Sequence, residues 1–256
     1  MLKMLKYEFR RGLLPILIVA LILAAIEVYF VIATVLKESE HSAISFSLLI
    51  LAAFCCYLFV LIYGIVIYNQ DLKNKSGYLV FMAPVSSYKI IGAKLLAILI
   101  TGIAFVALIG LFVVIDYNLI SARYSSVETF REFIDVLLGT GGYSLTTILL
   151  NVLAFILIFL IQFYMTITLA YLAVSISSTV LQNKKIKGFL SFLLFCVLYS
   201  LISVIAINLP VLGNPDSVTT FRESVYAMLP QIIFYVVIAI AGYIGSAALL
   251  EKKISL

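Results

Sequence analysis

Six long apolar blocks are the strongest constraint on how this sequence can fold. A helix needs about 20 mostly apolar residues to cross the hydrocarbon core of a bilayer, and each block is about that long or longer. The blocks comprise residues 13–36, 44–68, 90–115, 145–175, 189–208 and 232–250. The sequence therefore predicts an all-α membrane protein, in which residues 1–256 form a single transmembrane domain with six membrane-spanning helices. Because the fourth block is longer than a span requires, we expect it to tilt, to break or to run on into the cytoplasm.

The composition of the chain excludes several classes of protein. Hydrophobic residues make up 64% of the chain and charged residues 11%, whereas soluble domains carry roughly 25% charged residues. This balance excludes a soluble enzyme, a disordered protein and a nucleic-acid-binding protein. The three cysteines, Cys55, Cys56 and Cys196, lie in apolar blocks without a C-x-x-C pair. We interpret them as packing residues and expect neither a disulfide framework nor a zinc site.

The distribution of basic residues predicts the orientation of the chain. Thirteen of the 17 lysines and arginines fall in the N-terminal segment, in the connection after block two and the start of block three, in the connection after block four, and at the C-terminus. Eight of the 12 acidic residues fall in the other connections. Cytoplasmic loops carry an excess of Lys and Arg, so we predict a multi-pass protein with both termini in the cytoplasm.

Residues 1–12 form a basic segment ahead of the first block. On a helical wheel, Leu2, Leu5 and Phe9 share one stripe, and the basic residues share another. These basic residues are Lys3, Lys6, Arg10 and Arg11. The pattern predicts an amphipathic helix that lies in the membrane interface and contacts lipids. The alternative is an ordinary basic flank without a shape of its own.

The connection before the sixth block predicts a short helix on the outer side. Val218, Phe221, Val225 and Leu229 recur there at helical spacing, framed by Pro215 and Pro230. A similar pattern lies between Asp116 and Tyr143. Neither connection is long enough for a folded external domain.

Motifs of enzyme chemistry are absent from the sequence. It contains no G-x-x-x-x-G-K-[ST] phosphate loop, no H-E-x-x-H, no G-x-S-x-G and a single histidine, His41. We therefore predict a non-enzymatic protein without a nucleotide-binding domain, a metal site or a cofactor of its own.

Glu27 is the one ionisable residue well inside a predicted span. An intramembrane charge indicates a functional site by default, so one interpretation is a substrate or gating contact. The other is a partly protonated carboxyl group that bonds to a tyrosine or an amide, or reaches outer water. With Asp116 placed in an outer connection, the sequence predicts no pair of intramembrane carboxylates.

Asn151 and Gln162 in the fourth block can form hydrogen bonds between helices, with substrate contact as the alternative role.

The connection between blocks two and three contains an apolar stretch, Gly77 to Met82, that is too short to span a membrane. Pro84 disfavours helical backbone at Ala83, and Ser86 or Ser87 can cap the helix of the third block. An apolar stretch on the cytoplasmic side has to be shielded from water by other groups. The protein's own helices, the membrane interface and a partner subunit can each shield it.

These features together resemble the ABC-2-type (type V fold) permease subunits of ATP-binding-cassette transporters. The local match runs from Asp71 to Lys94, D-L-K-N-K-S-G-Y-L-V-F-M-A-P-V-S-S-Y-K-I-I-G-A-K. Bacterial members often carry a similar run, with an acidic residue leaving span two, an apolar turn that begins with glycine, a proline and a lysine that opens span three. The match covers nearly the whole chain in topology but only these residues in motif.

The resemblance implies a short cytoplasmic coupling helix that docks onto a separate ATPase. Its docking surface would be formed by Tyr78, Leu79, Phe81 and Met82 after Gly77, with Pro84 setting the turn. The helix over residues 1–12 would be the connecting helix of the family. The resemblance further implies a bacterial plasma membrane, a second permease copy in a homo- or heterodimer, and ATP with Mg²⁺ on the partner chain.

Three functions remain open at this stage. The first is a permease that exports an amphipathic or hydrophobic substrate, such as a peptide, an antibiotic or a lipid-linked molecule. The second is a membrane sensor or immunity subunit for a membrane-active peptide, such as an antimicrobial peptide. The third is a secondary transporter or channel that works without an ATPase. It is disfavoured because ion coupling generally uses intramembrane carboxylates, and the predicted spans contain only Glu27.

Overall fold

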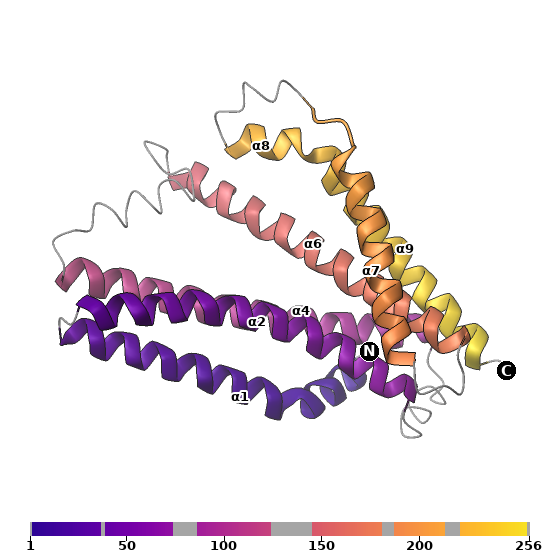
Figure 1. Ribbon diagram of the computed structural model, residues 1–256, viewed down its shortest axis with the longest axis horizontal. Coiled ribbons are helices and arrows are strands. Elements are labelled where there is room, and N and C mark those ends of the chain that lie inside the picture. The colour runs from indigo at the N-terminus through magenta and orange to yellow at the C-terminus, as the bar shows by residue number, and fades with distance from the viewer. Residues whose placement is uncertain are drawn as a thin grey trace. The chain divides into compact units, whose positions relative to one another are not determined.

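The computed structural model describes residues 2–36, 39–73, 86–123, 145–180, 187–212 and 221–254. Within these ranges the regular secondary structure is entirely α-helical (Figure 1). The helices are α1 (Leu2–Val35), α2 (Ser39–Lys73), α4 (Ser87–Arg123), α6 (Leu145–Val180), α7 (Lys187–Ile207), α8 (Phe221–Ala227) and α9 (Leu229–Ile254).

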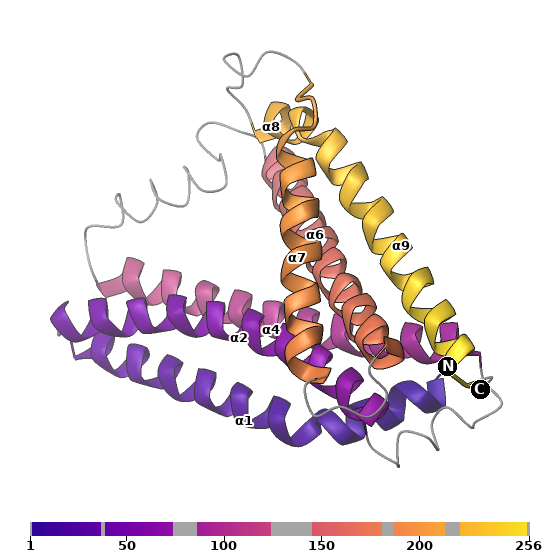
Figure 2. The same ribbon diagram turned by 45° about the vertical axis from the view of Figure 1, so that its right-hand side comes forward.

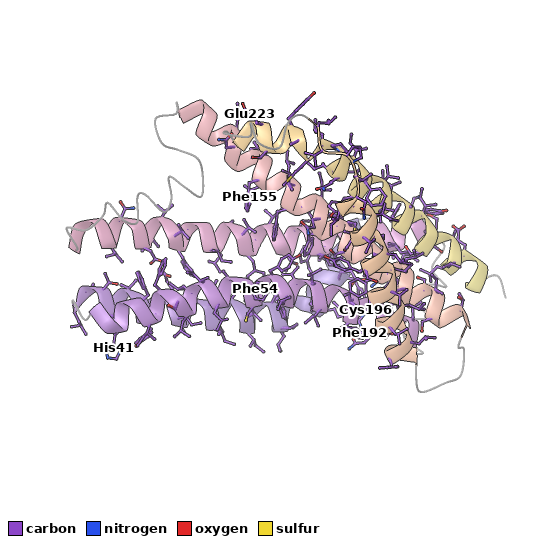
Figure 3. All side chains as sticks on the ribbon, turned by 45° about the horizontal axis from the view of Figure 1, so that its top comes forward. His41, Phe54, Phe155, Phe192, Cys196 and Glu223 are labelled. Atoms are coloured by element: carbon purple, nitrogen blue, oxygen red, sulfur yellow. The ribbon has the colours of Figure 1, made fainter. Side chains whose placement is uncertain are left out.

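Six of these helices are long and apolar enough to cross a membrane, and they coincide with the six predicted blocks. They are α1, α2, α4, α6, α7 and α9. Their surfaces carry large apolar side chains that the rest of the chain does not cover. Among those labelled in Figure 3, Phe54 of α2, Phe155 of α6 and Phe192 of α7 are each more than half exposed. Exposed apolar surface of this extent suits lipid as the solvent, so the chain is a multi-pass membrane protein.

The longest predicted block forms a single unbroken helix. α6 has 36 residues, which at the α-helical rise gives a length of about 54 Å. This exceeds the roughly 30 Å of the hydrocarbon core. The structure therefore excludes the predicted break and leaves tilting or an extension beyond the membrane.

The N-terminal segment and the first span also form one helix. We predicted an interfacial helix over residues 1–12 and a span that begins at residue 13, but α1 has no helix end there. Pro15 lies inside α1, where it removes one backbone donor without ending the helix. The ribbon of α1 changes direction in its N-terminal part (Figure 2). The interfacial location of residues 1–12 stays a prediction.

The chain divides into two compact units, and α2 and α4 contribute to both. Unit 1 comprises residues 1–66 and 92–131, and unit 2 comprises residues 67–91 and 132–256. The C-terminal end of α2 and the first residues of α4 therefore belong to unit 2. The segment predicted to couple to an ATPase lies between these two ends.

Aromatic contacts and close helix approach hold unit 1 together. The Phe30 ring of α1 lies 6.3 Å from the Phe46 ring of α2, and Phe59 of α2 meets Phe105 of α4 edge to face, with centroids 6.2 Å apart. Gly12 of α1 is buried against Tyr63 of α2, because a Cβ atom at Gly12 would lie only 1.7 Å from the tyrosine hydroxyl.

Unit 2 is built around the C-terminal half of α6, which packs against α7 and α9 (Figures 1 and 2). Met165 and Leu169 of α6 form a core with Ile202 of α7. The short helix α8 confirms the helix predicted before the sixth block. The connection after α7 bonds back to α8, because the Leu212 amide donates to the Ala227 carbonyl over 3.2 Å.

Candidate functional site

The helix ends on either side of the predicted coupling segment form the first part of the candidate site. The segment residues themselves lie outside the described part of the chain; they are Gly77, Tyr78, Leu79, Phe81, Met82 and Pro84. On the C-terminal side of this segment, α4 begins at Ser87, where the sequence predicted that Ser86 or Ser87 caps the helix. The Ser86 carbonyl accepts the Lys89 amide at 2.9 Å and the Ile90 amide at 3.3 Å. Ser86 therefore marks the start of the helix.

Tyr68 anchors the end of α2 to α6. Its side chain is fully buried and stacks on the Tyr171 ring, with centroids 4.1 Å apart and an interplanar angle of 16°. The Ser175 hydroxyl donates to the Tyr171 carbonyl at 2.8 Å. It therefore accepts the hydrogen bond of the Tyr68 hydroxyl, at 2.5 Å. One side chain thus joins α2 to two neighbouring turns of α6.

Tyr88 anchors the start of α4 to α9. The Tyr243 hydroxyl donates to the Tyr88 carbonyl at 2.9 Å, and the two rings meet edge to face with centroids 6.1 Å apart. Ile90 and Ile91 on the next turn are buried. The C-terminal end of α2 and the N-terminal end of α4, which flank residues 74–85, are therefore both held within unit 2.

In unit 1, an ion pair joins α4 to α1. The Lys94 ammonium group donates to Oε1 of Glu8 at 2.5 Å, and the two side chains are 2% and 8% exposed. Tyr63 of α2 lies within electrostatic reach of Glu8 and Arg11. Sequence analysis assigned Lys94 to the basic side of the membrane but missed Glu8, because an acidic residue among four basic ones shows no partner in the sequence.

The other residues of the predicted interfacial segment show a mixed exposure. Lys3, Lys6 and Arg10 are exposed, which agrees with a polar face, whereas Phe9 and Arg11 are half-buried. Gly12 and Glu8 are buried in unit 1. The N-terminal part of α1 therefore packs against helices of its own unit along one side.

Glu27 of α1 faces a second carboxyl group, that of Asp116 on α4. The two side chains interact with each other and are only 6% and 4% exposed. The prediction that no carboxylates pair within the spans is therefore wrong. It failed because hydropathy falls at Asp116, whereas the helix continues to Arg123 and the span includes Asp116.

Three of the four oxygens of this carboxyl pair have no hydrogen-bond partner among the described residues. Both oxygens of Glu27 and Oδ1 of Asp116 are buried without a partner. Among the described residues, no tyrosine or amide bonds to Glu27. The two interpretations of Glu27, a substrate or gating contact and a structural carboxyl group, both stay predictions. A buried polar group without a partner is unfavourable, so the burial of this pair requires compensation.

The two polar pairs are separated by about the thickness of a membrane core. From Glu8 to Glu27 along α1, the helical rise gives about 29 Å, and from Lys94 to Asp116 along α4 it gives about 33 Å. The hydrocarbon core of a bilayer is about 30 Å thick. The ion pair and the carboxyl pair thus lie near opposite ends of the membrane-spanning part of unit 1.

The two predicted amide residues of α6 differ in their exposure. Asn151 is half-buried and Gln162 is exposed. Within the described ranges, neither side chain bonds to a neighbouring helix. One amide that bonds to a neighbouring helix is Gln231 of α9, whose Nε2 donates to the Ala206 carbonyl of α7 at 3.1 Å. Sequence analysis missed Gln231 because it lies just before the sixth block.

Cysteine and metal chemistry add nothing to the site. Cys55, Cys56 and Cys196 are free thiols, and Cys196 lies exposed on α7 (Figure 3). In the described ranges, no cluster of three or more metal-ligating side chains occurs.

The Tyr68 anchor makes a testable contribution to stability. Replacing Tyr68 with phenylalanine keeps the stacked ring and removes its hydrogen bond, so we expect the free energy of unfolding to fall by about 1 kcal/mol. Titration with a denaturing detergent in mixed micelles measures this change. Tyr7→Phe, at a position that is 52% exposed, is the control. Equal effects of the two substitutions would contradict the buried bond.

Comparisons of this chain with protein-family models, with curated proteins and with solved structures each return no match.

Proposed function

We propose that this chain is the membrane-spanning permease subunit of an ATP-driven ABC transporter. It exports an amphipathic or hydrophobic substrate, such as a peptide, an antibiotic or a lipid-linked molecule. ATP and Mg²⁺ bind to a separate ATPase subunit, because this sequence has no phosphate loop. The permease sits in the bacterial plasma membrane with both termini in the cytoplasm, and it pairs with a second permease copy.

One observation carries the proposal: the helix ends around residues 74–85 are anchored to three other helices. Tyr68 ties α2 to α6, Tyr88 ties α4 to α9, and Lys94 ties α4 to α1. When a subunit docks on the apolar residues between these ends and moves them, the buried contacts transmit that movement to the attached helices. An ATPase that moves membrane helices requires such a rigid connection.

The transport cycle then follows from population shift. ATP binding to the partner stabilises one arrangement of the docked segment, and hydrolysis releases it. A partner can move a conformational equilibrium only by binding one state better than the other. The anchors at Tyr68, Tyr88 and Lys94 would transmit that preference to both units of the permease.

A second candidate function is favoured by the carboxyl pair. Glu27 and Asp116 supply the paired intramembrane carboxyl groups that ion-coupled secondary transport generally uses. A secondary transporter would carry out transport without an ATPase. The same purification experiment separates this alternative, and the sensor or immunity alternative, from the permease.

The experiment is affinity purification from native membranes in mild detergent, with mass spectrometry of co-purifying proteins. We expect a soluble ATPase with a phosphate loop in roughly stoichiometric amount. The double variant Tyr78→Asp/Phe81→Asp should reduce that ATPase at least tenfold while the permease stays in the membrane, because two charges desolvate poorly in an apolar dock.

The matched control is Asn74→Asp/Ser76→Asp, which adds the same charge to the same segment without removing apolar surface. We expect this control to retain the ATPase. Undiminished co-purification with the Tyr78/Phe81 variant would show that this segment is not the dock. A preparation without any ATPase, reproduced in nanodiscs, would favour the secondary transporter or the peptide sensor instead.

A further inference from the structure

The carboxyl pair of unit 1 requires something that binds between its two members. Glu27 and Asp116 come from different helices, face each other and are more than nine-tenths buried. Two ionised carboxylates that face each other repel, and burial raises the free energy of each charge. The charge of the pair must therefore be reduced by a positive species.

The surroundings do not supply that positive species from a side chain. Within the described residues, the charged neighbour of each carboxyl group is the other one, and neither Glu27 oxygen accepts a hydrogen bond. The lysine that α4 directs into unit 1, Lys94, is bonded to Glu8, about 33 Å away along the helix. The compensation has to come from solution.

A proton fits this position better than a larger cation does. Ca²⁺ and Mg²⁺ bound by protein oxygens take six or more ligands, whereas the described residues hold no cluster of three metal-ligating side chains. Three of the four oxygens of the pair are also buried from solvent. A single proton needs only two oxygens and forms a short, strong O–H···O⁻ bond between them.

We propose that Glu27 and Asp116 share one proton and form a hydrogen-bonded latch between α1 and α4. In the closed latch, one carboxyl group donates its O–H to the carboxylate of the other. When the latch opens, that O–H bond breaks, the proton passes to water, and two carboxylates remain that repel each other. The proposal concerns unit 1 alone and does not depend on an ATPase partner.

Two further titratable groups that the structure describes at this end of unit 1 are Tyr29 and His41. They lie on α1 and α2, and the Tyr29 hydroxyl is bonded to Nδ1 of His41 at 2.9 Å. His41 is exposed. The variant His41→Gln removes this imidazole and leaves both carboxyl groups of the pair in place.

The test is infrared spectroscopy of the full chain in lipid nanodiscs, titrated from acid to alkaline pH. A protonated carboxyl group absorbs in its C=O stretch, and the band shifts in D₂O. We expect one such band in the wild type at neutral pH and its loss in both Glu27→Gln and Asp116→Asn. The other buried carboxyl groups, Glu8 and Asp71, are intact in both variants, so a joint loss assigns the band to the pair.

Two controls keep the outcome decisive. Glu251→Gln, at an exposed position, and His41→Gln should retain the band, and the exchanged variant Glu27→Asp/Asp116→Glu should retain it at a shifted frequency. The measurement on the wild type does not depend on whether a variant folds. Absence of the band from the wild type at neutral pH overturns the proposal. A band that survives in Glu27→Gln overturns it too, as does a wild-type band that sodium chloride removes at constant pH.

Discussion

Replacing Lys94 with methionine is expected to lower the free energy of unfolding by about 3–5 kcal/mol, because it leaves Glu8 buried without its ammonium partner. Methionine keeps most of the volume of the lysine stem, so the loss reports charge rather than packing. Denaturing-detergent titration in mixed micelles measures it. Lys89→Met is the matched control, since Lys89 lies on the same helix but is exposed, and we expect its effect to stay within about 0.5 kcal/mol.

A double variant separates the ion pair from its surroundings. Glu8→Gln/Lys94→Met removes both charges, and we expect it to recover more than half of the loss, because burying two neutral groups is less unfavourable than burying one unpaired charge. A double variant as unstable as Lys94→Met alone would show that packing, and not the charge pair, accounts for the effect. Equal losses in Lys89→Met and Lys94→Met would contradict the buried bond itself.

Replacing Gly242 with leucine is expected to separate α9 from α6 at a cost of about 3 kcal/mol or more. A Cβ atom at Gly242 would lie 3.1 Å from the Thr168 carbonyl carbon and 3.2 Å from its oxygen. Backbone atoms of a packed helix cannot move aside as a flexible side chain can, so a larger residue forces the helices apart. Small residues at such positions are what allows transmembrane helices to approach closely.

The neighbouring residue provides the control for this prediction. Ala241 is exposed, whereas Gly242 is buried, so Ala241→Leu adds the same side chain on the outer side of α9. We expect Ala241→Leu to change the free energy of unfolding by less than about 0.5 kcal/mol. The two variants can be compared by thermal unfolding in nanodiscs. If Ala241→Leu is as damaging as Gly242→Leu, the close contact between α6 and α9 is wrong.

The six spans follow from the sequence because each is a local property. An apolar block of the right length must satisfy its backbone hydrogen bonds internally in lipid, and a helix does so without help from distant residues. The predicted limits of residues 189–208 therefore agree with α7 at Lys187–Ile207. Helix ends are less well predicted: α9 reaches from Leu229 to Ile254, because polar end turns extend a helix past its apolar core.

The residues of the candidate site also differ in whether the sequence alone can identify them. Sequence patterns identify Glu27 and the flanks of the predicted coupling segment, since an intramembrane acid and an apolar stretch next to a proline are visible in one dimension. They do not identify Asp116, Glu8 or Tyr68 as partners. Tyr68 and Ser175 are 107 residues apart, and Lys94 and Glu8 are 86 residues apart, and a single sequence holds no local trace of such a pairing.

Hydropathy thus determined that this protein has six membrane-spanning helices, because lipid acts on each segment separately and favours a long apolar helix. The tertiary structure decided which polar residues meet within each unit: an ion pair near one end of unit 1, a carboxyl pair near the other, and tyrosine anchors on α6 and α9 in unit 2. These contacts depend on how each helix is rotated and how deep it lies against its neighbours. Both are determined by side-chain packing between distant parts of the chain, which hydropathy does not measure.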